Sequence, residues 1–172
     1  MYIINDKVYS LYSLSINPDS YHTYRFRIYT FLKKLKFEYR QFDKWYDSLF
    51  DEDNHLIKGR EIIICEDLQG VILGVAILKN SMTEKKICTL RVGEKFQYQG
   101  IGTQLVKMSI DELGVEKPMI TINKNKLKQF KKLFDKYNFE LTQTKKHYYG
   151  IFNTELVFNG SLPDKKLFNN FK

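Results

Sequence analysis

The residues best suited to chemistry lie at 90–103, with the sequence LRVGEKFQYQGIGT. A β-rich run ends at Val92, and an apolar-periodic helix begins after Gly100. The first N–H groups of such a helix lack intrahelical partners and lie at the positive end of its dipole, so they bind phosphate or pyrophosphate. Gly100 and Gly102 let a ligand approach the backbone closely, and Gln97 and Thr103 add side-chain hydrogen bonds. The segment therefore predicts an anion-binding helix start.

The elements before this segment follow from hydrophobic periodicity. Residues 7–16 are strand-like, Asn17-Pro18 supplies a helix cap with a first-turn proline, and apolar residues at helical spacing continue to Leu35. A second, shorter helix is predicted over 42–49. Three β-rich runs then form an antiparallel meander, over residues 60–66, 71–80 and 85–92.

The elements after the segment alternate between helix and strand. Residues 118–122 form a short strand, and a basic amphipathic helix follows, with an apolar face that includes Phe130 and Phe134. Strands over 139–149 and 154–158 complete the chain. The predicted fold class is α/β (α+β), with a mixed central sheet, an antiparallel N-terminal meander, splayed strands and helices on both faces. We expect a single domain over residues 1–160 and a short polar tail over 161–172.

Composition limits the class of protein. The chain has 172 residues, 43% of them hydrophobic, which is enough for one substantial core. The longest apolar run is far shorter than the roughly 20 residues that span a bilayer, and residues 1–10 lack a basic start followed by an apolar segment, so we expect a cytoplasmic protein. Cys65 and Cys88 read as buried thiols, and the three histidines lack metal-ligand spacing, so no metal site is predicted. The net charge of +8 fits an A+T-rich coding sequence and also permits an acidic partner.

Residues 90–103 resemble the acetyl-CoA-binding motif of the GNAT superfamily of N-acetyltransferases. In that motif a strand leads to Gln/Arg-x-x-Gly-x-Gly/Ala at a helix start, and the matching residues here are Gln97, Gly100 and Gly102. The predicted order of elements fits the same family over about residues 10–160. The resemblance implies a GNAT-like fold and an enzyme that transfers an acetyl group from acetyl-CoA to an amine by direct attack in a ternary complex, without a metal.

The resemblance also implies which residues bind the cofactor. The pantetheine arm is expected on the backbone of residues 90–92, the pyrophosphate on the amides of residues 97–103, and the helix that begins at Asn125 beside the cofactor. The implied cofactor-binding residues are Leu90, Arg91, Val92, Gln97, Tyr98, Gln99, Gly100, Ile101, Gly102, Thr103, Asn125 and Phe134.

Direct attack needs a base for the amine and an acid for the leaving thiolate. Many members of the family carry the acid as the Tyr of a Leu-Tyr-x-x-x-Gly-Phe pattern. The corresponding stretch here is LFDKYNF, with Phe134 at the Tyr position, so Tyr137 is the candidate acid, and a core aromatic is its alternative role. Glu84 is the candidate base, against a solvated hairpin glutamate. Tyr148, Tyr149 and Glu155 are secondary candidates for the acceptor cleft.

Two further functions compete with the acetyltransferase. The lysine-rich stretch from Lys124 to Lys146 and the absent motif tyrosine also suit a weakly active or inactive basic module that binds nucleic acid. An acyltransferase acting on an amine carried by nucleic acid combines both ideas. The sequence does not identify the acceptor, which is either a small molecule or a macromolecule, and family habit suggests a homodimer through the last strands.

Overall fold

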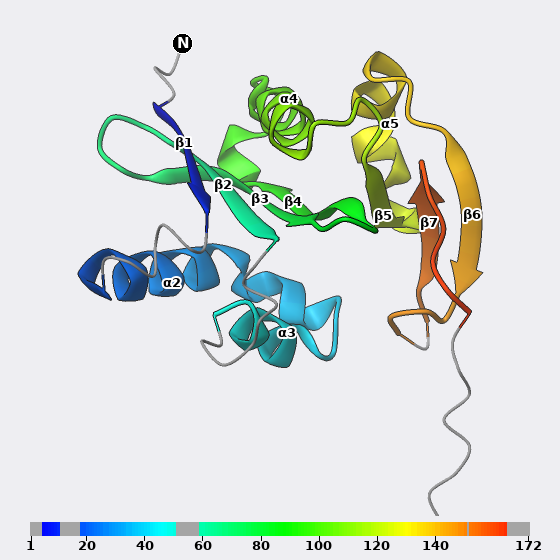
Figure 1. The fold of residues 1–172 in the computed structure, drawn as a ribbon, viewed down its shortest axis with the longest axis horizontal. Coiled ribbons are helices and arrows are strands. Elements are labelled where there is room, and N and C mark those ends of the chain that lie inside the picture. The colour runs from blue at the N-terminus through cyan, green and yellow to red at the C-terminus, as the bar shows by residue number, and fades with distance from the viewer. Residues whose placement is uncertain (1–4, 11–17, 51–58, 151, 165–172) are drawn as a thin grey trace, which may run out of the picture. The chain divides into compact units, whose positions relative to one another are not determined.

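The computed structural model describes residues 5–10, 18–50, 59–150 and 152–164 (Figure 1). Its contacts divide the chain into two compact units, Met1–Pro118 and Met119–Lys172. The single domain of residues 1–160 with a tail over 161–172 stays a prediction. Of that tail, Leu162 is buried and packs with Met119 and Val157. None of the helices in the described part of the chain has the length and apolar character needed to cross a membrane.

The first unit is an antiparallel meander with helices on both of its faces. Its strands pair in the order β1-β2-β3-β4. The elements in chain order are β1 (Asn5–Ser10), α2 (Pro18–Leu32), η1 (Lys33–Phe37), α3 (Phe42–Ser48), β2 (Arg60–Glu66), β3 (Ile72–Asn80), β4 (Lys85–Val92), η3 (Glu94–Phe96) and α4 (Ile101–Leu113).

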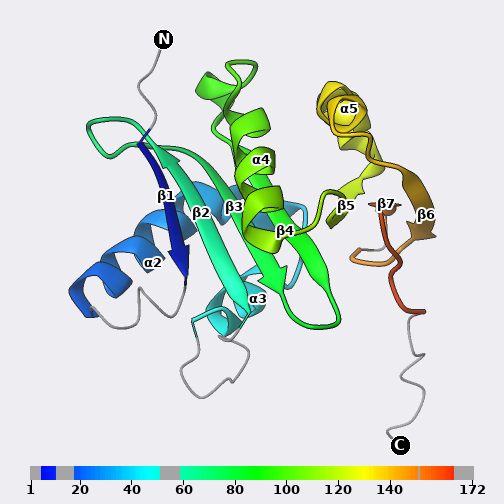
Figure 2. The same cartoon turned by 45° about the horizontal axis from the view of Figure 1, so that its top comes forward.

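The two faces of this sheet carry different helices, as Figure 2 shows. Side chains alternate along each strand, so Ile62 and Ile64 face α2 and α3 and join the core that contains Tyr46. The residues between them face α4, which contacts β2, β3 and β4. A buried ion pair from Arg27 of α2 to Glu66 of β2 adds a polar link to the first face.

The strand β4 contains a β-bulge. Thr89 lies opposite Ile77 while Ile87 lies opposite Leu78, so Cys88 is an extra residue without a partner in the ladder. The bulge resets the alternation of side chains along β4. As a result Lys86 and Thr89, three residues apart, lie on the same face of the sheet.

The second unit is a three-stranded antiparallel sheet with one α-helix. β7 lies between β5 and β6. Phe134 of α5 is 3% exposed and packs its ring against Phe139 and Phe158. The elements are β5 (Met119–Asn123), η4 (Lys124–Lys126), α5 (Leu127–Lys136), β6 (Leu141–Lys146) and β7 (Thr154–Phe158).

The predicted element types are confirmed, and several predicted boundaries are wrong. The helix expected to reach Leu35 becomes a 3-10 helix after Leu32, and Asn125 lies in η4 rather than in the α-helix. The strand expected over 139–149 ends at Lys146 because His147 has a left-handed φ of 56° and its N–H bonds to the Asn153 carbonyl. The part of the first predicted strand over residues 11–16 and the predicted helix cap at Asn17 lie outside the described residues.

Glu61 of β2 is a buried carboxyl beneath the C-terminal end of α4. Its Oε2 is buried without a hydrogen-bond partner among the described residues. Burial and the neighbouring charge of Glu112 raise the pKa of Glu61 to about 7. The carbonyl end of the helix dipole also disfavours a negative charge there.

Glu61→Gln should therefore change how stability depends on pH. Since the pKa of Glu61 is higher in the folded state, the contribution of this carboxyl to wild-type stability is greatest below pH 4.5 and falls as the pH rises through about 7. The variant lacks this loss, so we expect it to be more stable than wild type by about 1 kcal/mol at pH 8, allowing for partial solvent screening. Urea unfolding at pH 4.5 and pH 8 measures the difference. The same change in the free energy of unfolding between pH 4.5 and pH 8 in both proteins would contradict this prediction.

Candidate functional site

The N-terminus of α4 is open and has no side-chain cap. Gly100 is its N-cap residue, with a φ of 89°, and a Cβ at this position would meet no heavy atom within 4 Å. The first turn of α4 contains no acidic residue. The first-turn N–H groups have no carbonyl partners within the helix and carry the positive end of its dipole. This end of α4 is therefore suited to an anionic ligand.

Hydrogen bonds to β3 and within the loop hold the segment before α4 in place. The N–H of Gly93 bonds to the carbonyl of Leu73 at 2.9 Å, and the N–H of Phe96 bonds to the carbonyl of Gly93 at 2.8 Å. Gln99 donates from Nε2 to the carbonyl of Lys95 at 3.1 Å. Tyr98, which lies within this segment, has a left-handed φ of 63° and is 92% exposed. The loop thus holds a fixed path into the helix while Tyr98 points to solvent.

The position of α4 depends on Gly74 of β3. A Cβ on Gly74 would lie 2.9 Å from Cδ1 of Leu105 and 3.0 Å from Cγ2 of Ile101. Both leucine and isoleucine side chains are buried, so the first two turns of α4 rest directly on the strand. The missing Cβ therefore sets the distance of the anion-binding end from the sheet.

The structure brings most of the predicted cofactor residues together in the first unit. Residues 90–103 form the end of β4, the loop and the first turn of α4, and Leu90, Arg91 and Val92 are half-buried. Asn125 and Phe134 belong to the second unit. The N–H of Asn125 bonds to Oδ1 of Asn123 at 2.9 Å, and the Phe134 ring lies in that unit's aromatic core. Their cofactor contacts stay predictions.

The two candidate proton-transfer residues lie in different units. Tyr137 is half-buried at the C-cap of α5, and Lys136 Nζ lies 5.6 Å from its ring centroid. Glu84, in the hairpin before β4, forms ion pairs with Lys79 and Lys86. Burial raises the pKa of Glu84, but the neighbouring cations outweigh burial and hold it below its usual value.

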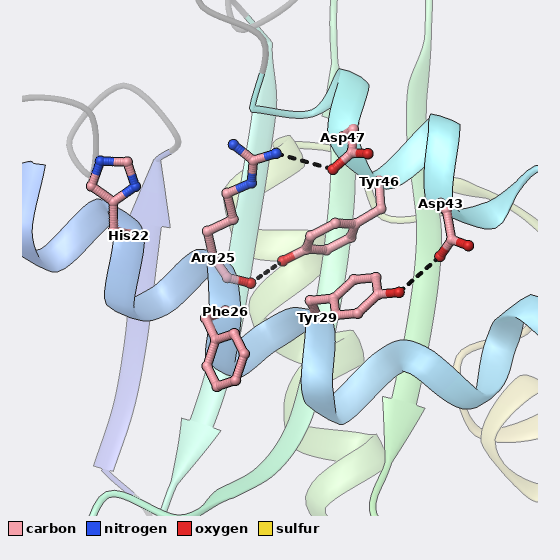
Figure 3. A pocket seen from close by; sticks show the side chains of 7 residues that line it. All are labelled: His22, Arg25, Phe26, Tyr29, Asp43, Tyr46 and Asp47. Carbon is pink, nitrogen blue, oxygen red and sulfur yellow. Dashed lines mark hydrogen bonds and ion pairs between the residues drawn. The ribbon is translucent and has the colours of Figure 1, made fainter.

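A pocket of about 430 Å³ lies at the outer surface of α2 and α3 (Figure 3). Its polar groups bond to one another across the two helices. Arg25 pairs with Asp47 at 3.0 Å, and Tyr29 donates to Asp43 at 3.0 Å. The Tyr46 hydroxyl donates to the backbone carbonyl of Arg25 at 2.6 Å. These bonds join α2 to α3. No sequence pattern predicts them, since the pairs are 14 to 22 residues apart on separate helices.

No three or more His, Cys, Asp or Glu side chains in the described ranges are grouped so that they could hold a metal ion. The secondary candidates Tyr148 and Tyr149 form an edge-to-face ring pair with centroids 4.8 Å apart, and Glu155 is fully buried on β7. The second unit thus places these three side chains on or next to its sheet.

Known proteins resemble the chain in sequence pattern and in fold. A family model described as an acetyltransferase (GNAT) domain matches residues 35–156. A GNAT-family protein from Desulfovibrio desulfuricans matches at a TM-score of 0.67 and 12% identity, covering 90% of this chain and 96% of its own.

Two further solved structures have the same fold. The ribosomal protein alanine N-acetyltransferase from Escherichia coli matches at a TM-score of 0.64 and 16% identity, with 91% of this chain and 92% of that chain covered. The spermidine N-acetyltransferase from Vibrio cholerae matches at 0.59 and 12% identity, with 90% and 91% covered. At these low sequence identities, the similarity shows a shared fold and nothing more. No curated protein matches the chain by sequence.

Glycine substitutions on β3 and on α4 test whether the close contact at Gly74 places the helix. Gly74→Ala should lower the free energy of unfolding by about 1–3 kcal/mol, because its Cβ overlaps Leu105 and Ile101. Gly102→Ala is the matched control, since its Cβ meets only Val92 Cγ2 at 3.7 Å, and it should raise stability by up to about 1 kcal/mol. Chemical denaturation measures both. Equal effects of the two substitutions would exclude the close contact.

Proposed function

The chain belongs to the GNAT family of acetyltransferases, and we propose that it transfers the acetyl group of acetyl-CoA to the nitrogen of an amine by direct attack in a ternary complex. The observation that carries this proposal is the open N-terminus of α4, which follows β4 after η3 and a short loop and has neither a side-chain cap nor an acidic residue in its first turn. A helix end of this kind stabilises a pyrophosphate. The excess of basic residues over acidic ones also favours an anionic cofactor.

Acetyl-CoA supplies a thioester carbon for attack and a thiolate as the leaving group. The residues of the first unit fit such a donor. The N–H groups of Ile101, Gly102 and Thr103 would hold the pyrophosphate, and the space beside Gly100 admits it without steric conflict. The half-buried backbone of residues 90–92 would orient the pantetheine arm. Fixing the donor in this way reduces the entropy cost of bringing it to the amine.

An amine is the acceptor class that we propose. Two proteins of the same fold are named for amine acceptors, a ribosomal protein alanine in one case and spermidine in the other. The acceptor must lose a proton when its nitrogen attacks, and Glu84 is a weak base for this step because neighbouring cations lower its pKa. Solvent water is an alternative proton acceptor. The roles of Glu84 as base and Tyr137 as acid stay predictions.

The basic second unit gives no separate candidate function. Lys131 pairs with Asp135 at 2.9 Å, and Lys145 pairs with Asp164 at 2.5 Å. Part of the lysine-rich surface that suggested nucleic-acid binding is therefore neutralised within the unit itself.

Calorimetric titration with acetyl-CoA and with CoA tests the donor site. Gly100→Glu places a carboxylate at the N-terminus of α4, and we expect it to weaken CoA binding by at least about tenfold through repulsion of the pyrophosphate. Gly114→Glu is a matched control. Gly114 also has a positive φ, of 64°, and open space, but it caps the opposite end of the same helix. Equal affinities in the two variants would place the pyrophosphate elsewhere.

A second measurement tests the acid. If Tyr137 protonates the leaving thiolate, Tyr137→Phe should lower kcat by about a hundredfold and leave CoA affinity unchanged. The phenyl ring keeps the packing, and only the hydroxyl group that donates the proton is lost. Steady-state kinetics over a pH range, with binding measured in parallel, separates the two effects. An unchanged kcat would remove Tyr137 from the mechanism.

A further inference from the structure

Three cationic side chains form a row across β2, β3 and β4 at one end of the meander. Arg60 lies opposite Lys79, and Lys79 lies opposite Lys86. Directly opposed residues share a face of the sheet, and Arg60 is two residues from Ile62, which packs against α2 and α3. The three cations therefore lie side by side on that face. We call Arg60, Lys79 and Lys86 the cation row.

The described residues supply one carboxylate to the cation row. Glu84 Oε2 accepts a hydrogen bond from Lys79, and its Oε1 lies 4.0 Å from Lys86 Nζ. Arg60 is turned toward the bulge, where its Nη1 lies 3.1 Å from Cys88 Sγ. All three cations help to lower the pKa of Glu84. Within the described ranges, the three cations and this single carboxylate leave the row with two more positive charges than negative ones.

Placing three cations side by side lowers the stability of the folded protein. Like charges directly opposite each other on neighbouring strands are destabilising. Lys86 is only 8% exposed, and the nearer Glu84 carboxylate oxygen, at 4.0 Å from its Nζ, is beyond hydrogen-bond distance. Lys79 remains partly exposed and leaves the row open to solvent. Such a conflict with local stability is expected where a ligand is bound.

The cation row lies at the opposite end of β4 from the proposed donor site. Lys86 is the second residue of the strand, whereas the loop to α4 follows Val92, about 20 Å away along an extended chain. The pyrophosphate at the N-terminus of α4 therefore does not reach the row. The pantetheine arm, expected on residues 90–92, would direct the reacting thioester toward the intervening part of the strand.

We propose that the cation row binds an oxyanion, a carboxylate or a phosphate, that the acceptor carries at a distance from its reacting amine. This inference rests on the proposed function and adds the class of acceptor. The planar guanidinium of Arg60 can donate two parallel hydrogen bonds to either group, and the ammonium groups of the two lysines add positive charge. Glu84 acts as the counter-ion that keeps Lys79 and Lys86 together before the acceptor arrives.

Thermal unfolding tests the row without reference to catalysis. The probe is inorganic phosphate, compared with chloride at equal ionic strength, on Lys86→Met and Lys85→Met. Lys85 is the adjacent residue and bonds to Asn80, so it is a matched control. We expect phosphate to raise the unfolding midpoint of wild type and Lys85→Met more than that of Lys86→Met. Phosphate at the N-terminus of α4 would act equally on both variants and cancel.

The row is excluded as an anion site if Lys86→Met and Lys85→Met respond to phosphate alike. Arg60→Met is a second variant and should lose the same response. Without phosphate, Lys86→Met should be at least as stable as wild type, since one of three like charges is gone. A large loss of stability in that variant would instead show that Lys86 is a structural ion-pair partner and would overturn the proposal.

Kinetics with paired acceptors distinguishes the two oxyanions. The carboxylate pair is lysine and 1,5-diaminopentane, and the phosphate pair is phosphoethanolamine and ethanolamine. We expect a KM about tenfold lower for the anionic member of one pair, and we expect Lys86→Met, but not Lys85→Met, to abolish that preference with little change in kcat. A preference that survives Lys86→Met would overturn the proposal. Failure to acetylate any amine would count against the proposed function, while the unfolding measurement would still decide the row.

Discussion

The contact between α4 and the bare backbone of Gly74 is the constraint on which the proposed donor site depends. Leu105 and Ile101 occupy the volume that a Cβ would fill, so the helix lies as close to β3 as its own side chains permit. Once that distance is fixed, the first-turn amides of α4 come to lie just beyond the end of β4. The donor that we propose needs this spacing, because strand and helix would bind different parts of the same molecule.

The two ends of α4 meet opposite electrostatic conditions. At the N-terminus the loop leaves the helix uncapped, so its partial positive charge is available to a ligand. At the C-terminus Glu61 of β2 is close enough to Glu112, in the last turn of α4, to feel its charge, and the Glu61 carboxyl is held partly protonated near neutral pH. The packing that orients the helix toward its ligand therefore also buries a poorly placed acid at the other end.

The sequence predicted the elements that depend on local pattern. The strand at Arg60–Glu66 and the helix after Gly100 follow from periodicity and from glycine chemistry, and the structure confirms both. The end of β6 was missed because one histidine is too weak a signal to end a strand, although histidine is among the residue types enriched at left-handed φ. The cation row was also missed. Its members are distant in sequence, and their meeting depends on the registers of β2, β3 and β4 and on the bulge at Cys88.

The bulge at Cys88 divides β4 into two halves with independent side-chain phases. Without the extra residue, strict alternation would turn Leu90 toward α2 and α3 and would turn Thr89 toward α4. With it, the side chains of the half that begins at Lys85 and of the half that ends at Val92 are oriented independently. On the roles proposed for the two halves, the residues of the first could change, and with them acceptor preference, while the second keeps the same donor. An engineer who wished to retarget the enzyme would work on one side of a single cysteine.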